Sequence, residues 1–201
     1  MSLNLRMIVV LTAVGLIAGG LLSVVNILTA ERIELNRLRE IEEAITQVVP
    51  GTVTSEIRHE EENLIVYSGK DAAGKELGYA VYASGTGFQD IIKIMFGTDP
   101  SVEKLYSLTV LEQKETPGLG AKITDRNAFL EYWENKDVRQ PLTLRKPAVA
   151  SPQDLSATEV NTITGATISS QKVLDTVNLS LERLRRALQE GILEKEDQDA
   201  D

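Results

Sequence analysis

The sequence contains no cysteine and only one histidine, His59. The absence of cysteine excludes disulfides, iron–sulfur clusters held by thiolates, and thiolate zinc sites. With one histidine, the chain cannot provide both axial ligands of a bis-histidine haem or form a His-rich metal site. Any redox chemistry of this protein therefore has to come from an organic cofactor.

Positive charge is also scarce, because 21 lysines and arginines stand against 30 aspartates and glutamates, which gives a net charge of −9. Such a chain lacks the basic patch that neutralises phosphates, so we expect no nucleic-acid partner. The sequence has no Walker A motif, no His-Glu-x-x-His and no Gly-x-Ser-x-Gly. These absences argue against P-loop nucleotide hydrolysis, zincin chemistry and serine hydrolysis.

One long uncharged run lies near the start of the chain, from Met7 to Ala30. About 20 apolar residues cross a bilayer, so the run predicts a retained transmembrane anchor. A cleaved signal peptide or a buried core helix is the alternative, but Ser23 to Ala30 is not a clean small-residue cleavage site. The lysine and arginine bias does not orient the anchor by itself, because positive charges flank it on both sides: Arg6 before it, and Arg32, Arg37 and Arg39 after it.

The rest of the chain has the pattern of an α+β protein. We expect an anchor at 1–30, an amphipathic stalk helix at 31–50 that ends at Pro50-Gly51, a globular domain at 51–191 and an acidic tail at 192–201. Alternating apolar residues predict strands at 64–67, 77–83, 91–96, 105–111 and 142–144, with a short helix after Thr124 or Asp125. The last helix has an apolar face from Leu174 to Leu188 and ends at Gly191.

Gly85-Thr86-Gly87 resembles the start of a dinucleotide-binding fingerprint. Asp90 stands where the third glycine belongs, and the residues that follow predict a strand rather than a helix. A phosphate site of that type needs a helix N-terminus at this point. We therefore interpret these residues as a glycine-rich turn in a sheet.

Two further motifs can be read either structurally or functionally. Glu115-Thr116-Pro117-Gly118-Leu119-Gly120 contains the Pro-Gly pair of a type II turn, and its glycines would also let the backbone approach a flat ligand. Thr162 to Ser170 precedes the last helix, where Thr164 or Thr167 could cap the helix. The same free N–H groups and the helix dipole would equally favour a phosphate.

Taken together, these features resemble the FMN-binding domain family of the G subunit of the Rnf electron-transport complex. The resemblance rests on the single N-terminal span, on Gly85-Thr86-Gly87-Phe88, on the motif from Glu115 to Gly120, and on Thr164-Gly165-Ala166-Thr167 before the last helix. The C subunit of sodium-translocating NADH:quinone reductase is a homologue with the same features.

The resemblance implies an α+β domain with a mainly antiparallel sheet and packed helices, which carries FMN esterified to Thr167 by a flavin transferase that uses FAD and Mg²⁺. The cofactor-binding residues that it implies lie in the two motifs: Thr164, Gly165, Ala166, Ile168 and Ser169, and Glu115, Thr116, Pro117, Gly118, Leu119 and Gly120. Two positions depart from the family pattern, because Asn161 replaces an aspartate and Gln113 replaces a histidine.

The expected function is therefore electron relay through covalent FMN in an ion-translocating ferredoxin:NAD oxidoreductase complex, without a catalytic dyad of the chain's own. The expected partners are the other membrane subunits, among them a second flavin subunit, and the membrane lipid. The flavin domain is expected on the extracytoplasmic side of the cell membrane. The alternatives are the quinone-reductase subunit, a flavin-binding sensory or regulatory protein, and a pilin-like structural protein.

Overall fold

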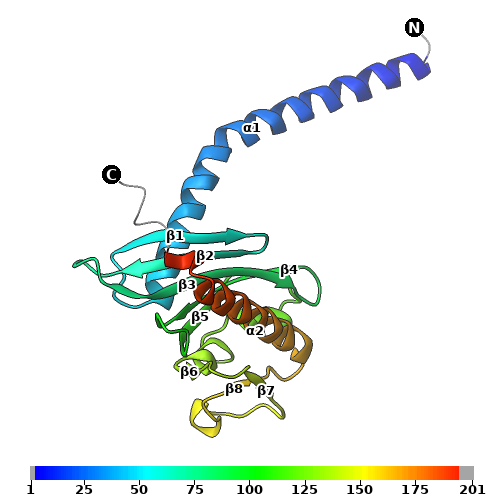
Figure 1. The fold of residues 1–201 in the computed structure, drawn as a ribbon. Coiled ribbons are helices and arrows are strands. Elements are labelled where there is room, and N and C mark those ends of the chain that lie inside the picture. The colour runs from blue at the N-terminus through cyan, green and yellow to red at the C-terminus, as the bar shows by residue number, and fades with distance from the viewer. Residues whose placement is uncertain (1–2, 195–201) are drawn as a thin grey trace, which may run out of the picture. The chain divides into compact units, whose positions relative to one another are not determined.

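The computed structural model describes residues 3–194 of the chain (Figure 1). It divides into two compact units, Met1–Ile41 and Glu42–Asp201. The part of the predicted acidic tail from residue 195 onward lies outside the described residues.

The first unit is the greater part of one helix, α1, which runs from Leu3 to Val48 and into the second unit. Every residue from 4 to 30 is exposed, including the large apolar side chains. By length and composition this helix is able to cross a membrane, since about 20 residues of α-helix span about 30 Å. The helix ends just before Pro50 and Gly51, as predicted, and Gly51 has φ +91°.

The second unit is built on a six-stranded sheet in which every strand pairs antiparallel with the next one in sequence. Its strands are β1 (Thr54–Glu61), β2 (Leu64–Lys70), β3 (Glu76–Thr86), β4 (Ile91–Thr98), β5 (Lys104–Glu112) and β6 (Lys136–Asp137). Strands β7 (Thr143–Arg145) and β8 (Glu159–Asn161) form a separate parallel pair. Helix α2 (Thr167–Gln189) and the short turns η1 (Gly120–Thr124), η2 (Leu130–Trp133), η3 (Pro152–Asp154) and η4 (Ile192–Glu194) complete the domain.

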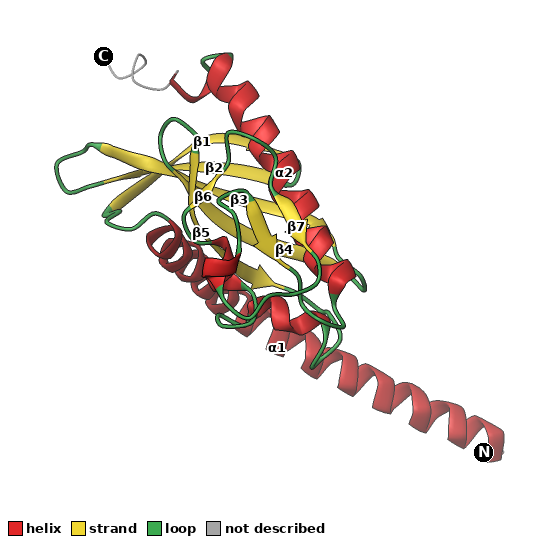
Figure 2. Cartoon of the chain, turned by 90° about the horizontal axis from the view of Figure 1, so that it is seen from below, coloured by secondary structure: helices red, strands yellow, loops and turns green. Residues whose placement is uncertain are grey.

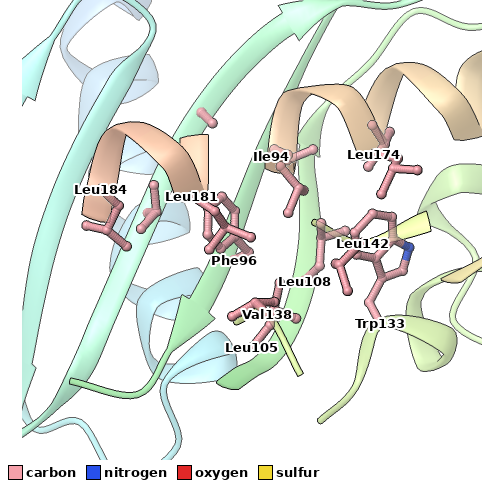
Figure 3. Packing of buried hydrophobic residues seen from close by; sticks show 14 of the residues in the cluster. Ile94, Phe96, Leu105, Leu108, Trp133, Val138, Leu142, Leu174, Leu181 and Leu184 are labelled. Atoms are coloured by element: carbon pink, nitrogen blue, oxygen red, sulfur yellow. The ribbon is translucent and has the colours of Figure 1, made fainter. Parts of the chain in front are cut away.

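The two faces of the sheet bury different elements (Figure 2). Ile94 and Phe96 of β4 belong to the main core together with Leu181 and Leu184 of α2. Figure 3 shows Leu181 and Leu184 beside Phe96, with Trp133 and Leu142 further along the same cluster. Neighbouring residues of a strand point to opposite faces. Gly97 accordingly meets the Val48 carbonyl, which leaves no room for a Cβ. The end of α1 and the residue after it therefore cover the second face with buried side chains: Ala44, Ile45, Val48 and Val49.

The α+β fold with a mainly antiparallel sheet is confirmed, and several details differ from the predictions. Strand β1 was not predicted, because half of its residues are charged and it shows no apolar alternation. The predicted strand at 142–144 lies one residue later, as β7. The predicted helix after Asp125 is instead a turn followed by the 3₁₀ segment η2, although the Asp125 carboxylate does accept a hydrogen bond from Ala128 N at 2.9 Å. Helix α2 ends at Gln189, and Gly191, which was predicted to stop it, follows two residues later with φ +67°.

Candidate functional site

Three segments that are far apart in the sequence meet at the carboxylate of Glu115, whose residue is only 4% exposed. One oxygen accepts hydrogen bonds from the backbone N–H groups of Phe88 at 2.7 Å and Gln89 at 3.1 Å, in the loop between β3 and β4. The other oxygen accepts a hydrogen bond from the Ser169 hydroxyl, at 2.7 Å, in the first turn of α2. The motifs singled out in the sequence are therefore parts of one site.

Two glycines make this close approach possible. A Cβ at Gly120 would lie 2.6 Å from a carboxylate oxygen of Glu115 and 2.7 Å from the Ser169 hydroxyl oxygen. A Cβ at Gly87 would collide with the other Glu115 oxygen and with the Asp90 carbonyl oxygen. Gly87 N–H also donates to that carbonyl oxygen at 2.8 Å, which closes the β3–β4 turn. The interpretation of these residues as a glycine-rich turn in a sheet is confirmed.

The Thr116–Leu119 turn has the geometry that its sequence predicts. Leu119 N–H donates to the Thr116 carbonyl oxygen at 3.1 Å, Pro117 takes the second position, and Gly118 takes the third with φ +77°. These are features of a type II turn. Pro117, Gly118 and Leu119 are all exposed, and a Cβ at Gly118 would meet no protein atom within 4 Å.

Helix α2 begins without a side-chain cap, so the expectation that Thr164 or Thr167 caps it is wrong. The N-cap residue is Ala166, which has no acceptor in its side chain, and Thr167 is the first helical residue. Thr164 lies outside the helix and is exposed, whereas Thr167 is half-buried. The N–H groups at the start of a helix remain unsatisfied when no side chain caps them, so this end retains its capacity to bind an anion.

A local hydrogen-bond network fixes the turn that leads into α2. The Ser170 hydroxyl accepts from Ile163 N–H at 3.1 Å and donates to the Ala166 carbonyl oxygen at 3.0 Å. Gly165 adopts φ +83°, and a Cβ there would lie 3.2 Å from Leu119 Cδ2. The turn before α2 and the Thr116–Leu119 turn are therefore in contact.

Each of the three segments also exposes one large apolar side chain. Phe88 is 59% exposed, Leu119 48% and Ile168 54%. Exposed apolar residues are ordinary when they are scattered singly. Here they come from the segments that converge on Glu115, which makes them candidates for contact with an apolar part of a ligand.

One ion pair links two of these segments at the surface. Lys114 Nζ lies 3.3 Å from an Asp90 carboxylate oxygen, and both side chains are well exposed. The hydrogen bond from Ile91 N–H, followed by the Lys114 ammonium, lowers the pKa of Asp90 below its usual value. Screening by water makes such an exposed pair a minor contribution to stability.

The two positions that depart from the family pattern have structural roles here. Asn161 is 3% exposed, and its side-chain amide pairs with the backbone of Val149: Oδ1 accepts from N–H at 3.0 Å, and Nδ2 donates to the carbonyl oxygen at 2.9 Å. The Gln113 side chain accepts from Glu115 N–H at 2.6 Å. Asn161 therefore holds the loop before β8, and Gln113 holds the backbone that presents Glu115.

Five of the residues expected in the site lie together. Glu115, Gly120 and Ser169 meet at the buried carboxylate, and Leu119 contacts Gly165. Among the described residues, no hydrogen bond or close contact joins the Thr164 side chain to this group. Sequence reasoning did not include Phe88 and Gln89 in the site, although the glycines before them had already indicated a turn.

Comparison with known proteins finds similarity to one domain family and to two relatives over most of the chain. Residues 87–182 match the FMN-binding domain family. The chain is 26% identical to the G subunit of the ion-translocating oxidoreductase complex of Methanosarcina acetivorans over 196 residues, which are 92% of this chain and 96% of the relative. It is 28% identical to the G subunit of the Na⁺-translocating ferredoxin:NAD⁺ oxidoreductase complex of Acetobacterium woodii over 189 residues, which are 86% and 87% of the two chains.

Among solved structures, the crystal structure of Shewanella oneidensis NqrC shares the fold. It superposes with a TM-score of 0.53 at 19% sequence identity, over 68% of this chain and 72% of that chain. Residues 87–182 thus match the FMN-binding domain family, and over most of its length the chain is similar to the G subunits of ion-translocating oxidoreductase complexes.

Proposed function

We propose that this protein is the membrane-anchored subunit that carries FMN, bound covalently through Thr167, and relays electrons in an ion-translocating ferredoxin:NAD⁺ oxidoreductase complex. The observation that carries the proposal is the meeting of the three motifs at Glu115, beside the uncapped start of α2. The relatives of the chain are subunits of such complexes.

The start of α2 fits the phosphate end of FMN. Thr167 is the first residue of the helix, and Gly165 and Ala166 before it have almost no side chain. A phosphodiester keeps one negative charge, which the N-terminus of a helix stabilises by about 0.3–1 kcal/mol. That energy is too small to retain FMN without a covalent bond, so the ester bond supplies the retention.

The surroundings fit the ring end of FMN. Phe88, Leu119 and Ile168 present exposed apolar surface, and the space at Gly118 is open. When FMN is bound, it supplies the redox chemistry that the side chains of this sequence lack. The chain's own residues hold the group, orient it and limit its contact with water.

The attachment is a phosphoryl transfer to the Thr167 hydroxyl. The Thr167 Oγ1 oxygen forms a P–O bond to the FMN phosphorus of FAD, the pyrophosphate bond breaks, and AMP leaves. A base of the flavin transferase accepts the hydroxyl proton, with Mg²⁺ at the phosphates. No electron is transferred in this step, and no residue of this chain acts as acid or base.

Helix α1 anchors the subunit in the cell membrane, with the flavin domain on the extracytoplasmic side. Its exposed apolar residues from 4 to 30 support a lipid-embedded anchor. The partners are the other membrane subunits of the complex, including a second flavin subunit. A subunit of sodium-translocating NADH:quinone reductase is the second candidate, supported by the fold shared with NqrC. The Acetobacterium woodii relative, which matches 86% of this chain, favours the ferredoxin:NAD⁺ type.

The test is the intact mass of the full-length protein produced with and without an active flavin transferase. The proposal predicts a mass increase of FMN minus water only with the transferase, together with flavin fluorescence that persists after denaturation. An unmodified mass in the presence of an active transferase would contradict covalent attachment. Co-purification with ferredoxin:NAD⁺ activity rather than quinone reduction separates the two candidate complexes.

A further inference from the structure

The Glu115 carboxylate is a buried acid to which the proposed electron relay assigns no role. Its partners in the described part of the chain are donors that carry no charge: the N–H groups of Phe88 and Gln89, and the Ser169 hydroxyl. An unsatisfied buried carboxylate is costly, so these bonds hold the segments that supply the donors.

The three partners belong to two segments that are far apart in the sequence. Ser169 is in the same first helical turn as Thr167, two positions later. Phe88 and Gln89 belong to the β3–β4 loop, and Gly120 packs against both Glu115 and Ser169. The position of the helix start relative to both loops therefore depends on this carboxylate.

We propose that Glu115 is a positioning residue for flavin attachment. Acting through Ser169, it fixes the start of α2 so that the Thr167 hydroxyl is presented to the flavin transferase in a reactive arrangement. The inference rests on the proposed function, since it concerns the same attachment at Thr167. It assigns the effect to the hydrogen bonds of the carboxylate rather than to its charge.

The experiment measures the initial rate of covalent FMN incorporation into the full-length chain in detergent, with FAD, Mg²⁺ and a flavin transferase. Glu115→Ala removes all three bonds, and Ser169→Ala removes only the bond to α2. Glu115→Gln keeps an oxygen acceptor for the two N–H groups and adds an N–H donor for the Ser169 oxygen. Glu60→Ala, which changes an exposed glutamate on β1, is the control for the loss of a negative charge.

Loss of a buried hydrogen bond corresponds to about tenfold in rate when it positions a reacting group, and a misplacement of the reacting atom by about 1 Å to about a hundredfold. We expect Glu115→Ala to lower kcat by about tenfold or more and Ser169→Ala to lower it by about fivefold, with KM for the acceptor chain nearly unchanged. Glu115→Gln should stay within about threefold of wild type, and Glu60→Ala should match it. Each folded variant should still reach complete labelling at long times, whereas partly unfolded protein would show a reduced end point.

The inference would be overturned if Ser169→Ala had the same kcat as wild type. It would also be overturned if the kcat of Glu115→Gln were as low as that expected for Glu115→Ala. If Glu115→Ala does not fold, these two variants decide the question by themselves. Hydrogen exchange in the flavin-free chain gives a readout without the cofactor: Glu115→Ala should expose the Phe88 and Gln89 amides, while Ser169→Ala should leave them protected. Wild-type chain that takes up no flavin would instead overturn the proposed function, and this inference with it.

Discussion

The side chain of Leu119 lies against Gly165, so that a Cβ at Gly165 would be 3.2 Å from Leu119 Cδ2. This contact joins the type II turn to the turn before α2, on the surface beside Thr167. Both glycines in these turns, Gly118 and Gly165, have positive φ. Their conformations set where the exposed apolar residues of the two turns lie.

Gly118→Val tests whether the type II turn lies beside the bound flavin. Since a Cβ at Gly118 meets no protein atom, the protein should fold, with a loss of about 1–2 kcal/mol from the positive φ. We expect the covalent flavin to remain, with an altered visible spectrum or midpoint potential. The spectrum and a redox titration measure this.

Gly74→Val is a matched control, because Gly74 also has a positive φ, of +79°, and open space at its Cβ, but it lies in the β2–β3 turn. The control should lose similar stability and leave the flavin spectrum unchanged. An unchanged spectrum and potential in folded Gly118→Val protein would remove this turn from the flavin site.

Asn161→Asp tests the structural role assigned to the residue that departs from the family pattern. An aspartate cannot donate to the Val149 carbonyl oxygen, and its charge would be buried, so we expect a loss of about 1–3 kcal/mol in the free energy of unfolding. Asn178 pairs in the same way with both backbone groups of Leu142, and Asn178→Asp provides the comparison. Urea unfolding should show a lower free energy of unfolding for both variants than for wild type. If Asn161→Asp is as stable as wild type and takes up flavin faster, then Asn161 affects flavin attachment and is not needed to hold the loop before β8.

Removal of residues 1–30 tests the anchor. These residues bury nothing in the described part of the chain, so the truncated protein should be soluble and folded. Removal of residues 1–50 should cost several kcal/mol more, because burial of a side chain such as Ile45 or Val48 contributes about 1.5–3 kcal/mol. Membrane fractionation and thermal unfolding measure the two effects. If the protein that lacks residues 1–30 still fractionated with stripped membranes, residues 1–30 would not be the only anchor.

The acid limb of the stability curve should depend on Asp137. The hydrogen bond from the Arg139 side chain, with a further bond from its backbone N–H, lowers the pKa of Asp137 from 3.8 to about 2. Because the folded pKa lies below the unfolded one, the stabilisation is complete above the unfolded value and is lost as the pH falls from about 3.8 to about 2. Asp137→Asn and Arg139→Gln should each lose less stability than wild type across this range, as measured by urea unfolding at each pH. If the free energy of unfolding fell with the same slope against pH in the variants and in wild type, Asp137 would not be the group responsible.

The sequence predicted the strands with an apolar face and missed those without one. Strands β2 to β5 were predicted because their buried residues give apolar stretches, whereas β1 is an edge strand with mostly exposed residues. Strands β7 and β8 are short, and each is fixed by a partner that is distant in sequence, so local pattern defines them poorly.

In the candidate site, too, the features that depend on local sequence were predicted and those that depend on distant residues were not. The type II turn follows from the Pro-Gly pair, which is local chemistry. The bond between Glu115 and Ser169 joins residues 54 positions apart, and nothing local to either residue predicts it. The capping prediction was wrong because the helix begins three residues after Thr164 and includes Thr167, which leaves Ala166 at the N-cap.

The central claim is the attachment of FMN at Thr167. Thr167→Ala and Thr164→Ala are matched variants that each remove one threonine hydroxyl from the same turn. Neither hydroxyl caps α2, so both proteins should fold with stability within about 0.5 kcal/mol of wild type.

The decisive measurement is the intact mass of each denatured variant after co-expression with an active flavin transferase. The account predicts that Thr167→Ala lacks the increment of FMN minus water and shows no in-gel flavin fluorescence, while Thr164→Ala carries both. Flavin that remains on folded Thr167→Ala protein, or that is lost from Thr164→Ala instead, would contradict it.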